Sequence, residues 1–157
     1  MKPTVYIETS VVSYLAARPS NDIRAAANQN ITADWWDNRR NDFDLYISEF
    51  VIAEASRGNE DAAARRMKAL EGIIELQVTE DVRDLARSLI NNGSLPIKAE
   101  LDAFHVAVAA VNGINYLLTW NCTHIANAVM RPKIESVCRS HGFEPSVICT
   151  PSELLEG

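Results

Sequence analysis

Short apolar runs alternate along this chain with longer stretches in which apolar residues recur every three or four positions. The runs are rich in β-branched and aromatic residues, which is typical of buried strands, and they cover residues 4–7, 44–47, 73–78, 116–119 and 146–149. Helical spacing marks residues 9–15, 22–40, 49–57, 60–70, 79–91, 101–111 and 132–141, with a brief terminal helix after Thr150. Strands that alternate with helices predict a three-layer α/β/α fold around a largely parallel sheet.

The segment 18–43 has the weakest helical pattern of the chain. Its apolar stripe leaves open whether it forms one helix or two helices divided near Asn30. We expect at least one of Trp35 and Trp36 to pack in the core, because buried tryptophan contributes a large apolar area. The segment is long enough to cover a cleft or to form a surface for a partner.

Composition predicts one globular domain over residues 1–157. Hydrophobic residues make up 47% of the chain and charged residues 23%, values that exclude a disordered protein. No apolar run approaches the roughly 20 residues of a membrane span, and the first residues lead directly into a strand without a signal-peptide pattern. The three cysteines are odd in number and widely spaced, which favours free thiols and a cytoplasmic location.

The formal charge of −6 argues against a broad basic surface that grips nucleic acid. It does not argue against a nuclease whose carboxylates hold divalent cations, because the bound metal reverses the local charge. Phosphate-binding glycine loops, a dinucleotide-binding fingerprint and the nucleophile elbow of hydrolases are all absent from the sequence. The remaining candidates for chemistry are acidic.

Four oxygen-bearing side chains are expected at one edge of the sheet. Glu8 follows the first strand and Asn121 follows the fourth, while Glu54 and Asp102 lie on helices that can flank the same edge. Such a set suits Mg²⁺ or Mn²⁺, which prefer oxygen ligands. Two structural alternatives remain open at this point: Asp102 as a favourable charge in the first turn of its helix, and Glu54 on a solvated helix edge.

Three stretches carry a more specific signal: VYIETSVVSYL, YISEFVIAEASRG and LDAFHVAVAAVNGINYLLTWN. Together they resemble the PIN domain, and in particular the VapC-like ribonuclease toxins of toxin–antitoxin pairs. The resemblance spans essentially the whole chain and includes the terminal ICTPSEL segment. It implies a parallel sheet flanked by helices, with acidic residues that bind magnesium or manganese for RNA cleavage.

The resemblance assigns residues one at a time. The first, second and third acidic positions of the family fall on Glu8, Glu54 and Asp102, and Asn121 stands where many members have a further aspartate. The hydroxyl residue beside the first acid corresponds to Thr9 or Ser10, and the threonine at the end of the strand to Thr119. This chain departs from the family pattern at Glu8, which replaces an aspartate, and at the neutral Asn121, and both changes bear on metal affinity. Residues His105 and His124 lie near the site in sequence and are candidates for contact with substrate phosphates.

Two hypotheses follow from the sequence. The first is a magnesium- or manganese-dependent endoribonuclease that acts as the toxin of a toxin–antitoxin pair, with RNA as substrate, a cognate antitoxin as partner, a homodimeric state and no membrane association. The second is a PIN-like protein-interaction module with weak or lost nuclease activity, which the departures at Glu8 and Asn121 and the Trp35-Trp36 pair suggest.

Overall fold

A sheet of five parallel strands forms the centre of the computed structural model, which describes residues 1–156. The strands are β1 (Thr4–Ile7), β2 (Asp44–Ile47), β3 (Ile74–Glu75), β4 (Tyr116–Leu118) and β5 (Val147–Cys149). Their order across the sheet is β3-β2-β1-β4-β5, and every pair of neighbours is parallel. The predicted parallel sheet is confirmed, although its third strand is shorter than the run 73–78.

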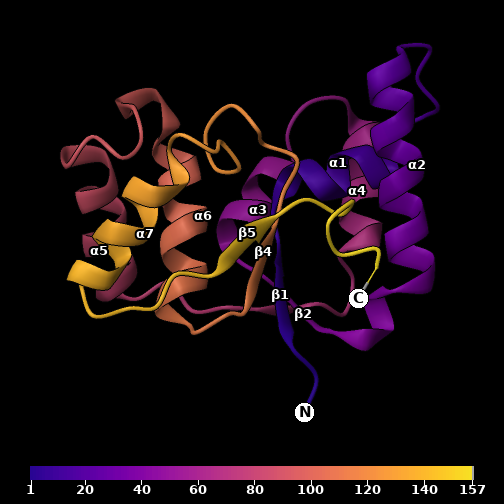
Figure 1. Ribbon diagram of the computed structural model, residues 1–157. Coiled ribbons are helices and arrows are strands. Elements are labelled where there is room, and N and C mark those ends of the chain that lie inside the picture. Colours follow the sequence, from indigo (N-terminus) through magenta and orange to yellow (C-terminus); the bar gives the residue numbers. More distant parts are fainter. Residues whose placement is uncertain (157) are drawn as a thin grey trace.

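Helices cover both faces of this sheet (Figure 1). The described residues form α1 (Thr9–Ala16), α2 (Ile23–Asn38), α3 (Glu49–Ala55), α4 (Glu60–Ala69), α5 (Glu80–Asn91), α6 (Glu100–Val111) and α7 (Arg131–Ser140), with short 3-10 turns at Arg40–Asp42 and Ile97–Ala99. Helices α5, α6 and α7 pack together on one side, and α1, α2 and α4 on the other. Helix α3 contacts both α4 and α6. The predicted three-layer α/β/α fold is therefore confirmed.

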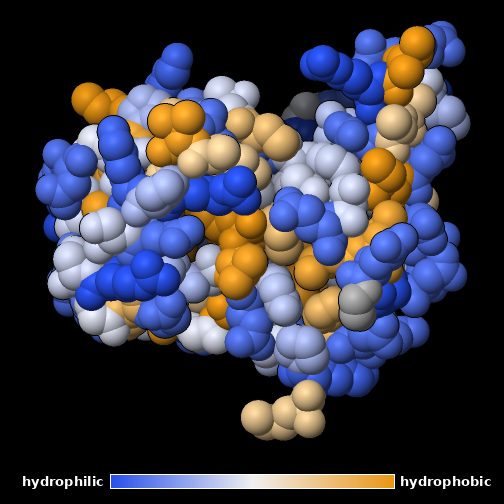
Figure 2. Space-filling model, viewed as in Figure 1, coloured by the Kyte–Doolittle hydropathy of each residue, from blue (hydrophilic) through white to orange (hydrophobic). Residues whose placement is uncertain are grey.

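The core lies where the apolar pattern places it. In β1, Val5, Tyr6 and Ile7 are fully buried because both faces of this central strand are covered by helices. Helix α5 buries the stripe that its spacing predicts, with Val82, Leu85, Ala86 and Leu89 inside. In the view of Figure 2 the flanking helices show mainly hydrophilic residues, and hydrophobic residues gather in the middle over β4 and β5. No helix in the described part of the chain combines the length and hydrophobicity that a bilayer span requires.

Segment 18–43 contains one continuous helix, α2, which runs through Asn30 without a break. Asp22 caps it by accepting a hydrogen bond from the Ala25 backbone N–H at 2.9 Å. Trp35 is fully buried, and the half-buried Trp36 lies under the guanidinium of Arg40, which is 4.0 Å from the ring centroid. The expectation that at least one of the two tryptophans packs in the core is confirmed.

Two arginines of α4, Arg65 and Arg66, stabilise the ends of neighbouring helices. Both are half-buried and bond to the ends of other helices. Arg65 donates from Nε to the carbonyl of Ala16, and Arg66 donates from Nε to the carbonyl of Ala55, each at 2.9 Å. These carbonyls lack partners within their own helices, and a guanidinium is well suited to such acceptors. Arg66 thus anchors the last turn of α3.

One local prediction near the carboxyl end is wrong. Residues 151–155 form turns, so the helix expected after Thr150 does not continue. The Thr150 N–H does bond to the Glu153 carboxylate at 3.1 Å, as in a capping box, but a cap satisfies one donor and does not offset the cost of nucleating a helix. The helix expected over residues 132–141 is confirmed as α7, which begins at Arg131 after turns over residues 122–130.

Candidate metal centre

Glu8 lies at the junction between β1 and α1. Its backbone N–H still bonds to the carbonyl of Leu118 in β4 at 3.0 Å, so the residue continues the sheet register. Its side chain accepts a hydrogen bond from the Ser10 N–H at 3.1 Å and so caps α1. The Glu8 side chain turns back over the start of α1 to reach this N–H. The residue is only 4% exposed and lies at the edge of the sheet.

Two hydroxyl groups bind the same oxygen of this carboxylate. Ser10 Oγ and Thr119 Oγ1 each donate to Glu8 Oε1 at 2.5 Å. Each hydroxyl also accepts a backbone N–H from the loop after β4, Trp120 to Ser10 at 2.8 Å and Asn121 to Thr119 at 2.9 Å. These contacts join the start of α1 to the end of β4 and fix the carboxylate, while Oε2 accepts only the Ser10 N–H among the bonds of the described residues.

Glu54 reaches the same region from α3. Its Oε1 accepts from Thr9 Oγ1 at 2.8 Å and pairs with His105 Nε2 at 2.5 Å. Burial acts to raise the pKa of the Glu54 carboxyl, but hydrogen bonds from His105 and Thr9 and the positive charges of His105 and Arg57 together lower it below its usual range. Glu54 is therefore an ionised acceptor at neutral pH, and the solvated helix edge considered from sequence is excluded.

His105 is fully buried on α6 beside the side chain of Glu54. Burial disfavours its charged form, yet the hydrogen bond to Glu54 and the charges of Glu8, Glu54 and Asp102 raise the pKa of its ring. Its Nδ1 lies 2.7 Å from the hydroxyl of Tyr6, which in turn lies 2.7 Å from Ser48 Oγ. Burial raises the pKa of Tyr6 well above that of a free phenol, so this hydroxyl keeps its proton.

Asp102 occupies the first turn of α6 and bonds to the loop after β4. Asn121 Nδ2 donates to Asp102 Oδ1 at 3.0 Å, and His124 Nδ1 lies 2.9 Å from Asp102 Oδ2. The side-chain oxygen of Asn121 accepts the backbone N–H of His124 at 3.1 Å. Asn121 and His124 therefore orient the Asp102 carboxylate, and the amide nitrogen of Asn121, not its oxygen, faces it.

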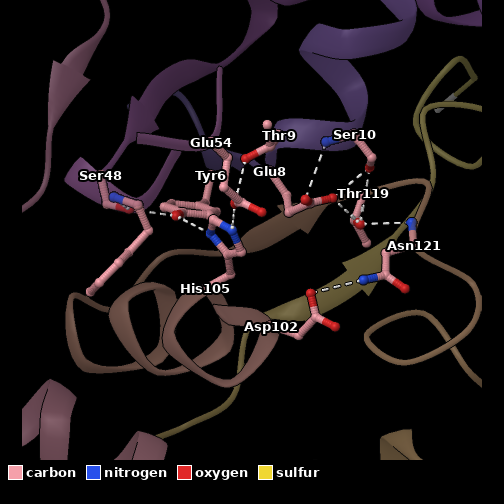
Figure 3. A network of polar contacts seen from close by, with 11 residues as sticks. Tyr6, Glu8, Thr9, Ser10, Ser48, Glu54, Asp102, His105, Thr119 and Asn121 are labelled. Atoms are coloured by element: carbon pink, nitrogen blue, oxygen red, sulfur yellow. Dashed lines mark hydrogen bonds and ion pairs between the residues drawn. The ribbon is translucent and has the colours of Figure 1, made fainter. Parts of the chain in front are cut away.

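The structure brings all four predicted residues to the carboxyl edge of the sheet, in two connected groups (Figure 3). In the first group, ligand atoms of Glu8, Glu54 and His105 lie within 4.8 Å of one another. Asp102 and Asn121 form the second group. Among residues 1–156, no lysine or arginine forms an ion pair with Glu8, Glu54 or Asp102, so histidines are the only basic side chains paired with these three carboxylates.

This donor set fits a hard divalent cation. Carboxylate oxygens are the ligands that Mg²⁺ and Mn²⁺ prefer, and a cation balances the charges of three carboxylates that no lysine or arginine pairs with. All the hydroxyl and imidazole residues singled out from sequence lie in this network: Thr9 on Glu54, Ser10 and Thr119 on Glu8, His105 on Glu54, and His124 on Asp102. A divalent ion at such a site activates water and neutralises phosphate charge.

Sequence reasoning missed the contact between Tyr6 and Ser48. Ser48 does cap α3, since its Oγ accepts the Phe50 N–H at 3.3 Å, but it also bonds to Tyr6. The available signal was a tyrosine in the middle of an apolar strand, because a buried phenol needs a hydrogen-bond partner. The sequence does not show which partner that is.

The family model of the PIN domain matches residues 5–121. This chain belongs to the PIN-domain family. The match begins in β1 and ends at Asn121, so it includes Glu8, Glu54, Asp102 and Asn121. The PIN fold is also found in a solved structure with similar architecture, VapC20 of Mycobacterium tuberculosis, described as a sarcin–ricin loop cleaving toxin. The two chains superpose with a TM-score of 0.56 at 19% sequence identity, over 73% of this chain and 87% of VapC20. The chain matches none of the curated proteins.

Proposed function

We propose that this PIN domain is a magnesium- or manganese-dependent endoribonuclease that acts as the toxin of a toxin–antitoxin pair. The observation that carries the proposal is the set of Glu8, Glu54 and Asp102 at one edge of the sheet, none of which forms an ion pair with a lysine or arginine of the described residues. Family membership supports a nuclease, and the similar fold of a toxin described as cleaving the sarcin–ricin loop supports the toxin role.

Each side chain has a role in the proposed site. Glu8, Glu54 and Asp102 would hold the cation, which supplies a water of lowered pKa and neutralises charge on the scissile phosphodiester. Ser10 and Thr119 hold the Glu8 carboxylate through Oε1, and Oε2 accepts only the Ser10 N–H among the bonds of the described residues. Asn121 donates a hydrogen bond that orients the Asp102 carboxylate, and we propose this role for it instead of that of a charged metal ligand.

The metal count follows from charge. Three carboxylates suit one divalent ion that retains several waters, whereas the neutral Asn121 adds no charge for a second ion. We therefore propose a site with one tightly held ion.

His124 donates to Asp102 and is half-buried in the loop after β4, where it can contact a substrate phosphate.

The test is cleavage of RNA by the wild type, Asp102→Asn and the control Asp44→Asn. Asp44 is exposed at the start of β2, at the opposite edge of the sheet, so its substitution removes the same charge away from the site. The substrates should include a sarcin–ricin stem-loop, because that is the RNA named for VapC20. The proposal predicts cleavage that needs Mg²⁺ or Mn²⁺, stops with EDTA, is abolished in Asp102→Asn and persists in Asp44→Asn. Equal cleavage by Asp102→Asn and the wild type would overturn the site assignment.

The toxin role has its own test. We propose a cytoplasmic homodimer whose cognate antitoxin occupies the acidic edge, and a basic antitoxin segment is electrostatically suited to it. Growth arrest on expression of the wild type, relief by the neighbouring gene of its operon and copurification of the two proteins would support this role. An isolated chain whose expression does not slow growth would contradict it, even if the purified protein cleaves RNA.

The alternative function is a protein-interaction module without nuclease activity, and a lack of RNA cleavage in these experiments would support it. The tryptophan pair does not favour it, because Trp35 is fully buried and Trp36 is covered in part by Arg40. The nuclease is favoured because all three carboxylates are present and each is held by hydrogen bonds.

A further inference from the structure

A buried chain of hydrogen bonds leads from α3 through β1 and α6 back to Glu54. Ser48, Tyr6 and His105 are each fully buried. Ser48 Oγ and Tyr6 Oη are 2.7 Å apart, Tyr6 Oη and His105 Nδ1 are 2.7 Å apart, and His105 Nε2 is 2.5 Å from Glu54 Oε1 (Figure 3). One ring nitrogen of His105 also lies within 4.8 Å of ligand oxygens of Glu8 and Glu54. His105 is therefore either a metal ligand or a hydrogen-bond donor to a carboxylate.

When the His105 ring is neutral, the donors and acceptors around it favour a hydrogen bond from His105 to Glu54 over a bond to the metal. An ionised carboxylate only accepts, so His105 Nε2 carries the hydrogen and Nδ1 has the free lone pair. Tyr6 then donates to Nδ1, and Ser48 donates to the Tyr6 oxygen. Ser48 Oγ still accepts the Phe50 N–H as the cap of α3. In this arrangement every hydrogen of the chain has an acceptor.

If His105 were a metal ligand, the hydrogen bonds from His105 through Tyr6 to Ser48 would run in the opposite direction, and one buried donor would have no partner. A metal bond at Nε2 requires the hydrogen on Nδ1, which would donate to the Tyr6 oxygen. Tyr6 would donate in turn to Ser48, whose own hydrogen has no acceptor among the bonds of the described residues. Burying an unsatisfied hydroxyl donor is unfavourable. Glu54 would also lose one of its two side-chain donors.

We propose that Tyr6, Ser48 and His105 are positioning residues that hold the Glu54 carboxylate for the metal, and that His105 itself is not a ligand. The inference rests on the proposed function, in which Glu54 binds the ion. Outer partners of this kind fix the direction of a carboxylate lone pair and raise metal affinity without touching the metal. The free oxygen Oε2 of Glu54 is then the one available to the cation, because Oε1 accepts from Thr9 and His105.

The first test reads the tautomer directly and does not depend on nuclease activity. Long-range ¹H–¹⁵N NMR spectra of the wild type are recorded in EDTA at alkaline pH and again with saturating Mg²⁺, with His105→Gln used to assign the ring signals. We expect a hydrogen on Nε2 and an unprotonated Nδ1 in both states. A hydrogen on Nδ1, or loss of the Nε2 hydrogen when Mg²⁺ binds, would overturn the proposal.

The second test measures Mg²⁺ and Mn²⁺ affinity by calorimetry for the wild type, Tyr6→Phe and Tyr46→Phe. Tyr46 is the partner of Tyr6 in the sheet register on β2, and it has no part in the network, which makes it a matched control. Loss of the Tyr6 hydroxyl should lower the affinity for both ions about tenfold, in the range found when outer partners of metal sites are removed. Tyr46→Phe should leave both affinities unchanged. The ring of residue 6 stays in place, so its packing is kept.

The outcomes separate the inference from the function on which it rests. If the wild type binds both ions and Tyr6→Phe binds them equally well, positioning through Tyr6 is wrong and the metal site stands. If the wild type binds neither ion, the proposed function fails and this inference fails with it.

Discussion

The contact between Asn121 and Asp102 allows a sharp test of the acidic site by a change of one atom. Asn121 Nδ2 lies 3.0 Å from Asp102 Oδ1, and its other side-chain atom accepts the His124 N–H at 3.1 Å. Aspartate has the same shape as asparagine. Asn121→Asp therefore keeps the acceptor for His124 and replaces the donor beside Asp102 with a second negative oxygen.

The size of the effect follows from distance and burial. Two like charges 4 Å apart repel by about 1 kcal/mol in bulk water and by about 4 kcal/mol at an effective dielectric constant near 20. The Asp102 side chain is 17% exposed, so the site lies between these limits. We expect the free energy of unfolding without metal to fall by about 2 kcal/mol. For a domain of this size that corresponds to a Tm lower by about 4–8 °C.

Thermal unfolding in EDTA and in saturating Mn²⁺ measures this effect. In EDTA the Tm of Asn121→Asp should fall below that of the wild type, and Mn²⁺ should remove or reverse the difference, because the ion neutralises both carboxylates. Asn115→Asp is the control: Asn115 is exposed, and its oxygen accepts the Thr4 N–H at 2.9 Å, a bond that a carboxylate retains. Equal Tm values for Asn121→Asp and Asn115→Asp in EDTA, with no added response to Mn²⁺, would refute this description of the site.

Two further predictions concern the thiols and pH. Burial raises the pKa of Cys138 to about 11 and that of Cys149 to about 12, whereas Cys122 is exposed. A thiol reagent should therefore modify one cysteine rapidly in the native protein and three after unfolding; rapid native modification of more than one would contradict the burial. In EDTA, the raised pKa of His105 gives stability that is complete below the unfolded pKa of about 6.5 and is lost as pH rises through the folded pKa. In denaturant unfolding, the free energy of unfolding of the wild type should exceed that of His105→Gln, and this excess should shrink from mildly acidic to alkaline pH. An excess that does not change with pH would exclude the ion pair between His105 and Glu54.

The sequence predicted the architecture because the relevant signals are local. Apolar β-branched runs mark the strands, and caps such as Thr79, whose Oγ1 accepts the Val82 N–H at 3.4 Å, mark helix starts. A glutamate directly after a buried strand was also readable, since an acidic side chain at that place is costly unless it has a partner. For this reason Glu8 could be singled out before its neighbours were known.

The arrangement of the site was not readable, because its contacts join residues far apart in the chain. Tyr6 and His105 are 99 positions apart, and Thr119 and Glu8 are 111 apart. Which nitrogen of His105 meets Glu54, and whether the amide nitrogen or the oxygen of Asn121 faces Asp102, depends on the packing of three helices against the sheet. The predicted role of Asn121 as an oxygen donor stays a prediction, and the structure favours its part as a hydrogen-bond donor to Asp102.

Calorimetric titration of Mn²⁺ into the wild type and Asp102→Asn, in parallel with circular dichroism of both proteins, tests the central claim most directly. The account predicts saturable binding of about one ion per chain, since three carboxylates suit a single hydrated ion, and binding at least tenfold weaker in Asp102→Asn with an unchanged fold. Equal affinity in the two proteins, or no detectable binding by the wild type, would contradict a metal centre at this edge of the sheet.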